Sequence, residues 1–370
     1  MLLSFFVLCI TLTSLALPSA VTCCPPAELA ALLSIKSSLH ATQVGVFDSW
    51  SGHNCCLMWY GVTCDPETGS VAEVTLRAIS EEPIFEEATK PGYMRGIISP
   101  SVCQLKNLSS LIVTDWKGIE GEIPSCLTSL SSLRIINLAG NCLSGMIPKD
   151  IGKLSRLTVL DVADNKLTGC IPGSITRLSS LMHMDLRNNQ LTGRLPRDFS
   201  QLKMLSRALL SGNKLTGTIP SSMSRIYRLA DLDLSMNMIS GRIPASLGKM
   251  PVLETLNLDS NRITGPIPAS LIRSRMSNMN LSNNGIDGAI PDMFRSRSYF
   301  MLLDLSFNNL RGKVPKSLQK ASFVGHLDLS HNHLCGRIPS GSPFDRLEAS
   351  SFSFNDCLCG MPLEDCKENH

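Results

Sequence analysis

One asparagine recurs at a fixed spacing through most of this chain. Six copies follow one another every 24 residues (165 − 141 = 24), and three more continue the series with a one-residue slip: Asn141, Asn165, Asn189, Asn213, Asn237, Asn261, Asn284, Asn308 and Asn332. Self-similarity at a period of about 20 to 50 residues is typical of proteins that stack copies of one short unit. The spacing therefore predicts an elongated solenoid.

Each copy carries the same local pattern, seen in residues 157–172. Leu160 and Val162 alternate as in a strand, so both point inward and Asp161 points to solvent. The amide of Asn165 is expected to satisfy backbone groups where the chain leaves the strand, and the glycine and proline that follow permit a tight turn. One short strand is therefore predicted per unit.

The segment after each proline is predicted to form a short helix. In the unit above, this helix would bury Ile175, Leu178 and Leu181. Stacking such units places the strands in one parallel sheet on a concave face and the helical turns on a convex face. The predicted fold is therefore an α/β repeat solenoid.

The N-terminal residues 1–22 are predicted to be a secretory signal peptide. Residues 1–17 are apolar and uncharged, and the small residues Ser19 and Ala20 suit cleavage. A membrane anchor is the alternative, but Thr11 and Ser14 interrupt a stretch that is short for a span. No second long apolar run follows, so the mature chain is expected to be secreted, without a membrane span.

The cysteines fit the same compartment. The chain has 14, and most cluster towards its two ends. Zinc is the rival explanation for such clusters, but in an exported chain without paired Cys-x-x-Cys motifs, disulfides are favoured.

Further motifs carry a resemblance to a known family. The Gly-x-Ile-Pro element recurs, as in residues 145–148 and 217–220, and residues 27–64 and 334–366 hold flanking motifs with paired cysteines. With these features the chain resembles plant leucine-rich-repeat proteins, among them the polygalacturonase-inhibiting proteins. It is still more similar to the plant extracellular proteins called DNA-damage-repair/toleration proteins, through motifs such as residues 92–96, 115–118 and 323–328.

The resemblance implies a plant-type leucine-rich-repeat superhelix with disulfide-bonded caps. It divides the chain into an N-terminal cap with an acidic insert (23–95), about ten repeats (96–334) and a C-terminal cysteine cap (335–370). It implies the pairs Cys24–Cys55, Cys56–Cys64, Cys335–Cys357 and Cys359–Cys366. Cys103 and Cys126 fall at neighbouring convex turns and are expected to form another bridge, while the states of Cys23, Cys142 and Cys170 stay open.

Catalytic, metal and cofactor motifs are not found, so the chain is not expected to be an enzyme or to hold a cofactor or metal. His326, His331 and His333 occupy separate positions of one repeat, which disfavours a metal site. A formal charge of +3 from 34 basic and 31 acidic residues, scattered along the chain, disfavours nucleic-acid binding.

The concave face is the candidate binding surface. The position between the two inward-pointing apolar residues of each strand faces outward, and it is usually Asp or Asn. Taken alone, this recurrence is explained as the solvated default residue of such strands. Departures from that default, especially exposed arginines and apolar side chains, favour a protein-binding surface centred on residues 183–236. The predicted protein-binding residues are Asp161, His183, Asp185, Arg187, Arg207, Leu209, Asp231, Asp233, Met236, Asp259 and Phe307.

Two N-glycosylation sequons begin at Asn107 and Asn280. Asn280 falls in the concave column itself. A glycan there would screen the C-terminal half of the concave face, although strand residues are poorer acceptors than loops.

The leading functional hypothesis is an extracellular recognition protein of the plant cell wall that inhibits pathogen polygalacturonases through its concave face. The alternative is a soluble co-receptor or ligand-binding partner of plant receptor kinase ectodomains in defence or development. Pectin contact is a further expectation, but the scattered basic residues and the lack of a flat threonine array disfavour binding of pectin or ice as the main activity.

Overall fold

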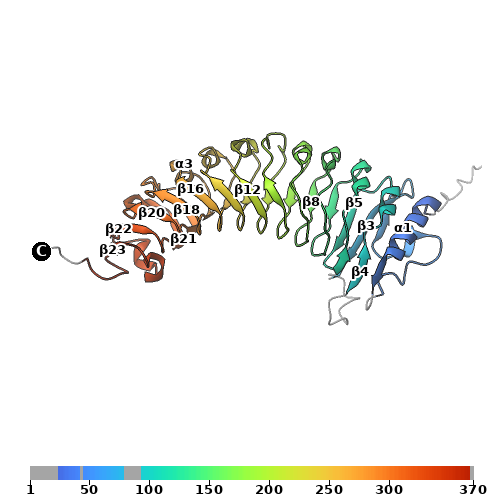
Figure 1. Cartoon of the computed structure of the whole chain (residues 1–370), viewed down its shortest axis with the longest axis horizontal. Coiled ribbons are helices and arrows are strands. Elements are labelled where there is room, and N and C mark those ends of the chain that lie inside the picture. The colour runs from blue at the N-terminus through green and yellow to red at the C-terminus, as the bar shows by residue number, and fades with distance from the viewer. Residues whose placement is uncertain (1–23, 42–44, 79–92, 367–370) are drawn as a thin grey trace, which may run out of the picture.

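The computed structural model describes residues 24–41, 45–78 and 93–366, which form an arched solenoid (Figure 1). A 12-stranded sheet lines the concave side, and all its pairings are parallel except β2 with β3. Its strands, in spatial order, are β2 (Val62–Cys64), β3 (Val71–Arg77), β5 (Ser110–Thr114), β7 (Ile135–Asn137), β8 (Val159–Asp161), β9 (His183–Asp185), β11 (Arg207–Leu209), β13 (Asp231–Asp233), β15 (Thr255–Asn257), β17 (Asn278–Asn280), β19 (Tyr299–Asp304) and β21 (Phe323–Asp328).

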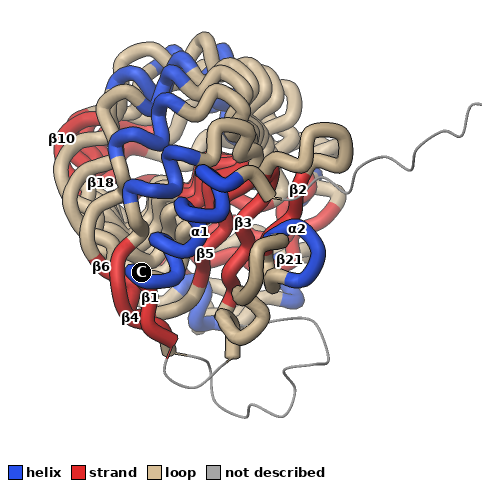
Figure 2. Tube along the Cα trace, turned by 90° about the vertical axis from the view of Figure 1, so that its right-hand side faces the viewer, coloured by secondary structure: helices blue, strands red, loops and turns tan. Residues whose placement is uncertain are grey.

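A second sheet, which the sequence reasoning did not predict, runs along another side of the coil. Viewed along the solenoid, β10 and β18 lie on one side and β3 and β5 on another (Figure 2). This 8-stranded parallel sheet consists of β10 (Thr192–Arg194), β12 (Lys214–Gly217), β14 (Met238–Gly241), β16 (Arg262–Pro266), β18 (Gly285–Gly288), β20 (Asn309–Gly312), β22 (His333–Arg337) and β23 (Cys357–Cys359). A small third sheet near the N-terminus joins β1 (Leu39–Ala41), β4 (Met94–Ile97) and β6 (Lys117–Glu120).

The convex turns are mostly 3₁₀ helices, which are shorter and tighter than the helices expected from the sequence. Ile175, Leu178 and Leu181 are nevertheless fully buried, as expected. The 3₁₀ helices are η2 (Pro100–Gln104), η3 (Ser125–Ser129), η4 (Ile151–Lys153), η5 (Gly173–Arg177), η6 (Ser221–Arg225), η7 (Leu247–Lys249), η8 (Lys316–Lys320), η9 (Phe344–Arg346) and η10 (Ala349–Phe352). The α-helices are α1 (Pro26–Ser38), α2 (Cys55–Met58) and α3 (Ala269–Ile272).

The repeated asparagines form a buried ladder that joins each coil to the one before it. Asn189 donates its amide hydrogens to the carbonyls of Leu186 and Arg187 in its own coil, at 3.3 and 3.0 Å, and to Val162 of the preceding coil, at 3.0 Å. Its Oδ1 accepts from the backbone N–H of Leu167 at 2.9 Å. Because one side chain satisfies four backbone groups at a buried turn, only asparagine fits this position well.

The ladder ends one step beyond the series seen in the sequence. Asn355, 23 residues after Asn332 (355 − 332 = 23), accepts from the N–H of Leu334 at 3.0 Å and donates to Leu329 of the preceding coil. At the other end, the Oδ1 of Asn141 is buried without a hydrogen-bond partner among the described residues. Trp116 occupies the corresponding turn of the preceding repeat, so the regular pattern starts at Asn141.

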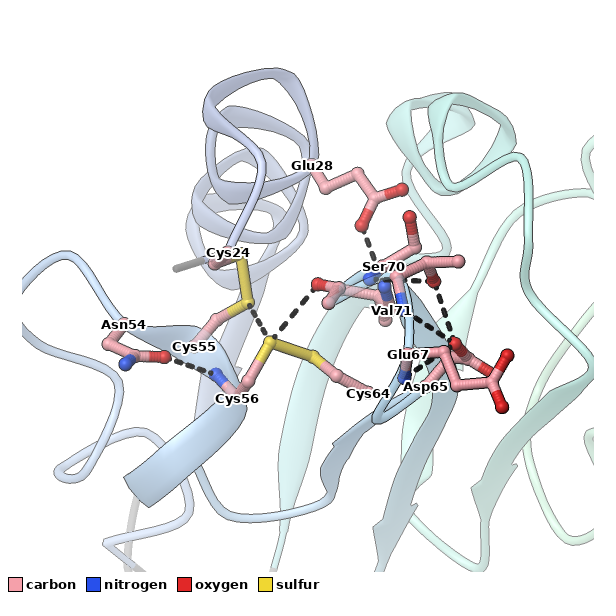
Figure 3. Close-up of a disulfide and its surroundings, with 12 residues drawn as sticks. Cys24, Glu28, Asn54, Cys55, Cys56, Cys64, Asp65, Glu67, Ser70 and Val71 are labelled. Atoms are coloured by element: carbon pink, nitrogen blue, oxygen red, sulfur yellow. Dashed lines mark hydrogen bonds between the residues drawn. A yellow bond between two sulfur atoms is a disulfide. The ribbon is translucent and has the colours of Figure 1, made fainter. Parts of the chain in front are cut away.

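The N-terminal cap covers the first strands of the concave sheet and holds two disulfides (Figure 3). Cys24 is bonded to Cys55, and Cys56 to Cys64, as the resemblance implies. Glu28 on α1 accepts a hydrogen bond from the backbone N–H of Val71 at 2.7 Å, so this buried carboxylate serves an otherwise unpaired group of β3. A repeat stack exposes core at its ends, and the cap shields it.

Three more disulfides complete the framework. They join Cys103 to Cys126, Cys335 to Cys357, and Cys359 to Cys366, which are the pairs expected from the sequence. Among the described cysteines, Cys142 and Cys170 are free. Both lie on the side of the second sheet, in neighbouring coils.

Several expectations fall outside the described residues, namely the signal peptide 1–22, Cys23 and the acidic insert around Glu81, Glu82, Glu86 and Glu87. Within the described part of the chain, no helix has both the length and the apolar character needed to cross a membrane.

We predict that Asn189→Ala lowers the free energy of unfolding by about 2–4 kcal/mol, because it leaves buried backbone groups of two coils without partners. Urea unfolding followed by circular dichroism measures the change. Asn309→Ala, at an exposed position of β20, is the control and should change stability by less than about 0.5 kcal/mol. Equal effects of the two substitutions would contradict the role given to the ladder.

Candidate protein-binding face

The sheet register brings the predicted concave residues into one column. Asp161 on β8 pairs with Asp185 on β9, and Leu209 on β11 lies between Asp185 and Asp233. The same register continues through Asn257, Asn280, Asp304 and Asp328. Residues that are 23 or 24 positions apart in the sequence are therefore neighbours on the surface.

The column has a local structural role. The Oδ1 of Asp161 accepts from the backbone N–H two residues on, at 3.1 Å, and Asp185, Asp233 and Asp304 repeat this bond. Such bonds tie the end of each strand to the turn that follows. The recurrence of Asp and Asn in the column is thus explained without a ligand, and the neighbouring positions carry more information.

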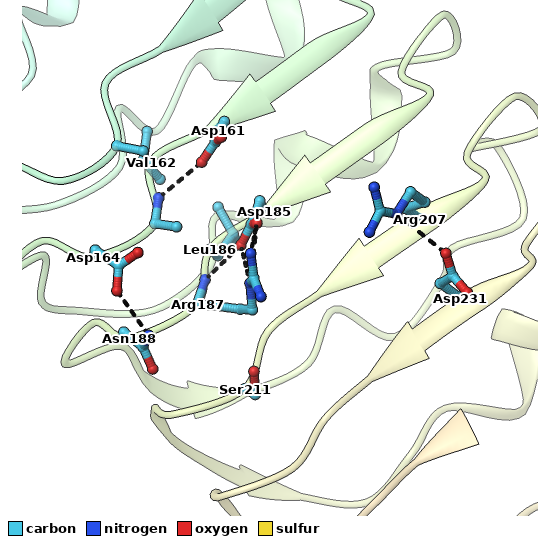
Figure 4. A network of polar contacts seen from close by, with 12 residues as sticks. Asp161, Val162, Asp164, Asp185, Leu186, Arg187, Asn188, Arg207, Ser211 and Asp231 are labelled. Atoms are coloured by element: carbon cyan, nitrogen blue, oxygen red, sulfur yellow. Dashed lines mark hydrogen bonds and ion pairs between the residues drawn. The ribbon is translucent and has the colours of Figure 1, made fainter. Parts of the chain in front are cut away.

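Two ion pairs occupy these neighbouring positions (Figure 4). Arg187 donates from Nε and Nη2 to the carboxylate of Asp185, with the shortest contact at 2.7 Å, and this bond raises the pKa of the guanidinium. Arg207 on β11 lies 3.1 Å from the carboxylate of Asp231 on β13. The arginines predicted as binding residues are therefore held in place by acidic neighbours and still half exposed, with side-chain exposures of 43% and 53%.

Asp161 and His183 lie beside these pairs without an ionic partner of their own among the described residues. Burial raises the pKa of the Asp161 carboxyl to about 6, and the nearby charge of Asp185 adds to this shift. Burial, followed by the charge of Arg207, lowers the pKa of the His183 imidazole. In both groups the charged form is poorly stabilised in the free protein.

The same cluster offers donor atoms to a metal. Ligand atoms of Asp161, His183 and Asp185 all lie within 4.8 Å of one another. However, Arg187 already bonds to both oxygens of Asp185, so the cation at this position is an arginine. We therefore describe the cluster as a charged network.

The three histidines considered from the sequence are not brought together. His331 stacks between the rings of Phe307 and Phe354, with centroid distances of 3.8 and 4.3 Å. His333 lies 3.0 Å from Asp356 at the second sheet, and His326 is exposed on β21.

Met236 and Phe307 both stand in the turn directly before a ladder asparagine. Their φ is 51°, a left-handed conformation that Gly140 and Gly212 supply in other repeats. Bulky side chains are unusual there, and both are exposed, at 61% and 48%. Apolar side chains held outward in a strained conformation suit a contact surface.

Other predicted residues differ in their surroundings. Leu209 stands in the concave column as expected but is buried, so it fills space between its neighbours and offers little contact surface. Asp259 accepts hydrogen bonds from Ser282 and Asn283 of the next coil. Asn280 accepts bonds from Ser282 and is half-buried in β17, whereas Asn107 is exposed at a turn.

The sequence reasoning missed a second aromatic pair near the C-terminal end of the concave sheet. Tyr299 on β19 stacks on Phe323 on β21 at 4.9 Å, and Met301 beside them is exposed. The signal was present, since Tyr299 and Phe323 are 24 residues apart (323 − 299 = 24).

The concave face keeps a surplus of acid after its ion pairs are formed. Arg187 and Arg207 are matched by Asp185 and Asp231. Further carboxylates of the face, which form no ion pair with a described residue, are Asp161, Asp233, Asp259, Asp304 and Asp328. A partner with basic side chains would complement this surface.

Comparison with known proteins identifies the repeat. The family model for the leucine-rich repeat region matches residues 95–336, and the model for the leucine-rich repeat N-terminal domain matches residues 25–65. The DNA damage-repair/toleration protein DRT100 of Arabidopsis thaliana is 54% identical over 124 residues, 33% of each chain. Polygalacturonase inhibitor 1 of Oryza sativa subsp. japonica is 32% identical over 126 residues, 34% of this chain and 33% of that protein. Each alignment thus spans about a third of the relative.

Solved structures share the fold over a longer stretch. A plant ice-binding protein has a TM-score of 0.69 and 28% identity, covering 94% of this chain and 100% of that one. The Arabidopsis receptor kinase HAESA, solved with the peptide hormone IDA and the co-receptor SERK1, has a TM-score of 0.67 and 26% identity, covering 90% of this chain and 58% of that one.

We predict that Asp161→Asn raises the free energy of unfolding at pH 7 by about 1–2 kcal/mol, after allowance for partial exposure of the group. Its raised pKa means that the folded chain binds the proton more tightly than the unfolded chain, so stability falls as the pH rises from about 4 to about 6. Asp161→Asn removes this loss of stability at pH 7. Its stabilising effect should therefore vanish near pH 4, where Asp161 of the folded protein is protonated.

Urea unfolding at the two pH values tests this prediction. Asp292→Asn is a control of opposite sign, because hydrogen bonds from Ser317 lower the pKa of the Asp292 carboxyl and its ionised form stabilises the fold at pH 7. A gain for Asp161→Asn that is independent of pH would contradict the assignment.

Proposed function

The chain belongs to the leucine-rich-repeat family, and from that premise we propose that it is a secreted plant cell-wall protein that inhibits pathogen polygalacturonases in defence. In this proposal the concave face binds the enzyme and blocks access of its polymer. The observation that carries the proposal is the cluster on β9, β11 and β13, where half-exposed arginines are held by ion pairs on an acidic surface. Fixed arginines with nearby exposed apolar side chains are frequent at the centre of protein interfaces.

The relatives support an extracellular, non-catalytic protein. Several are named polygalacturonase inhibitors, from Oryza sativa, Vitis vinifera and Pyrus communis. The five disulfides favour an oxidising compartment. An N-glycan at Asn107 would lie away from the concave face, whereas one at Asn280 would stand on it and direct the enzyme towards β8 to β13.

A soluble co-receptor or a ligand-binding partner of membrane receptor kinases is the second candidate. The match in fold to the HAESA ectodomain favours it, because that receptor was solved together with a peptide hormone and a co-receptor. Under this alternative the same concave cluster would contact a basic peptide or a receptor ectodomain.

We predict that Arg207→Ala combined with Asp233→Asn weakens inhibition of a responsive fungal endopolygalacturonase at least tenfold, about 1.4 kcal/mol. Asparagine keeps the bond from Asp233 to the N–H of Ser235, so the strand end stays intact while the charge is lost. The inhibition constant, measured with residues 23–370 from a secretory host, reports the effect.

A matched control pair on the convex turns is Arg228→Ala with Asp150→Asn, which should leave inhibition unchanged. Unchanged inhibition in the concave pair would contradict the placement of the site. If no enzyme of a broad fungal panel binds, the inhibitor function is wrong, and receptor kinase ectodomains become the baits for the second candidate.

A further inference from the structure

A small groove lies where the chain returns from the convex turns to the first concave strands. It has a volume of about 470 Å³, and none of its lining residues is acidic. Four successive coils contribute to it, and it is separate from both the concave cluster and the second sheet. We call it the hydroxyl-arginine groove, and its lining residues are Ser109, Ser132, Arg134, Arg156, Thr158 and Ser180.

Backbone hydrogen bonds place one row of these residues side by side. Arg134 donates its N–H to the carbonyl of Ser109 at 2.7 Å, and Thr158 donates its N–H to the carbonyl of Arg134 at 2.8 Å. The three residues directly precede β5, β7 and β8, whose parallel pairing continues the same register. Arg134 therefore stands between two hydroxyl-bearing residues of the neighbouring coils.

The second row lies two residues earlier in each coil. Ser132, Arg156 and Ser180 are 24 residues apart (156 − 132 = 24 and 180 − 156 = 24), so they occupy one repeat position. Leu157, which separates the two rows in its coil, is fully buried, so the residues on both sides of it turn outward. Arg134 and Arg156 thus stand diagonally in neighbouring coils, with Cα atoms on the order of 8 Å apart.

Arg134 and Arg156 have no counterion in the part of the chain that the structure describes. Both are exposed, and neither forms an ion pair with another described residue. The concave arginines differ, because acidic neighbours hold them in place. Two guanidinium groups in one groove repel each other, and an anion between them removes that repulsion. The planar fork of arginine also matches the geometry of phosphate oxygens.

The four hydroxyl groups of the groove fall into two kinds. Ser109 and Thr158 each donate the hydroxyl hydrogen to a backbone carbonyl of the preceding coil, at 3.0 and 2.9 Å. The oxygens of these two side chains are therefore left as acceptors. Ser132 and Ser180 form no side-chain hydrogen bond with another described residue, so their hydroxyl groups are available as donors.

A groove with both donors and fixed acceptors suits an anion that still carries a proton. A phosphate monoester has a second pKa of about 6, so near pH 5 its phosphate group keeps one P–O–H. That proton can be donated to Ser109 or Thr158, while the charged oxygens accept from the arginines and the other two serines. Sulfate has the same shape but no proton to donate, so it leaves both acceptors without a partner.

We propose that the hydroxyl-arginine groove binds a single phosphate group, as inorganic phosphate or as a phosphate monoester. In the next coils the two rows continue with Met182 and Met204, which offer neither a charge nor a hydroxyl group. The site therefore fits one small anion and does not extend along the solenoid. This inference goes beyond the proposed function and uses residues outside the concave cluster.

The test is isothermal titration calorimetry at pH 5 and low ionic strength, with inorganic phosphate and glycerol 2-phosphate as probes. The groove variant Arg134→Gln, Arg156→Gln removes both cations from exposed positions, so the fold should be retained. The control Arg225→Gln, Arg228→Gln removes the same charge from exposed residues. Arg228 occupies the repeat position of Arg156 (228 − 156 = 72, three repeats later) and has Ser206 where Arg156 has Arg134. We expect one site per chain, with at least tenfold weaker binding for the groove variant and less than a twofold change for the control.

Further arms separate the other outcomes. Inorganic sulfate should bind several-fold more weakly than phosphate, and Thr158→Val, which removes an acceptor, should narrow that difference. Tighter binding of inorganic phosphate assigns the free ion as the ligand, whereas equal or tighter binding of glycerol 2-phosphate assigns a phosphorylated molecule. Absence of saturable binding, equal losses in both double variants, or sulfate binding as tight as that of phosphate would each overturn the proposal. The groove variant should inhibit polygalacturonase normally, so failure here is distinguishable from failure of the inhibitor function.

Discussion

The buried asparagine ladder is the interaction on which the rest of the structure depends. From Asn165 onward, each amide joins the carbonyls of two successive coils and accepts an N–H from the coil before it, as Asn189 and Asn213 illustrate. Because a misplaced asparagine would leave several buried backbone groups unpaired, the ladder fixes how each coil is placed on the next. The convex turns are less constrained, and the one-residue slip between Asn261 and Asn284 is absorbed there, in the α3 coil.

Fixed register has a functional consequence, since every position of the repeat becomes a column on the surface. One such column gives the acidic concave face from Asp161 to Asp328. Each column mixes residues that serve the scaffold with residues that are free to contact a partner. Hydrogen bonds separate the two kinds on the concave side, because the aspartates bind their own backbone whereas Met236 and Phe307 are exposed.

Much of this was predictable from the sequence, for a physical reason. The repeat period and the alternation of Leu160 and Val162 define the solenoid and the concave column. The resemblance supplied four of the disulfide pairs, and the position of Cys103 and Cys126 at neighbouring convex turns supplied the fifth. The second sheet was missed because its strands are three to five residues long and all but β23 carry glycine, which weakens any strand pattern. The left-handed φ of Met236 and the burial of Leu209 depend on neighbouring coils, so one repeat read alone does not reveal them.

The proposed function depends on the concave face being the surface that binds the enzyme. A crystal structure of the chain in complex with a responsive fungal endopolygalacturonase tests this most directly. We expect the enzyme to contact the concave face around β9, β11 and β13, with Arg187 and Arg207 at the interface. An enzyme bound to the convex turns or to the second sheet, with Arg187 and Arg207 left free, would contradict the proposal.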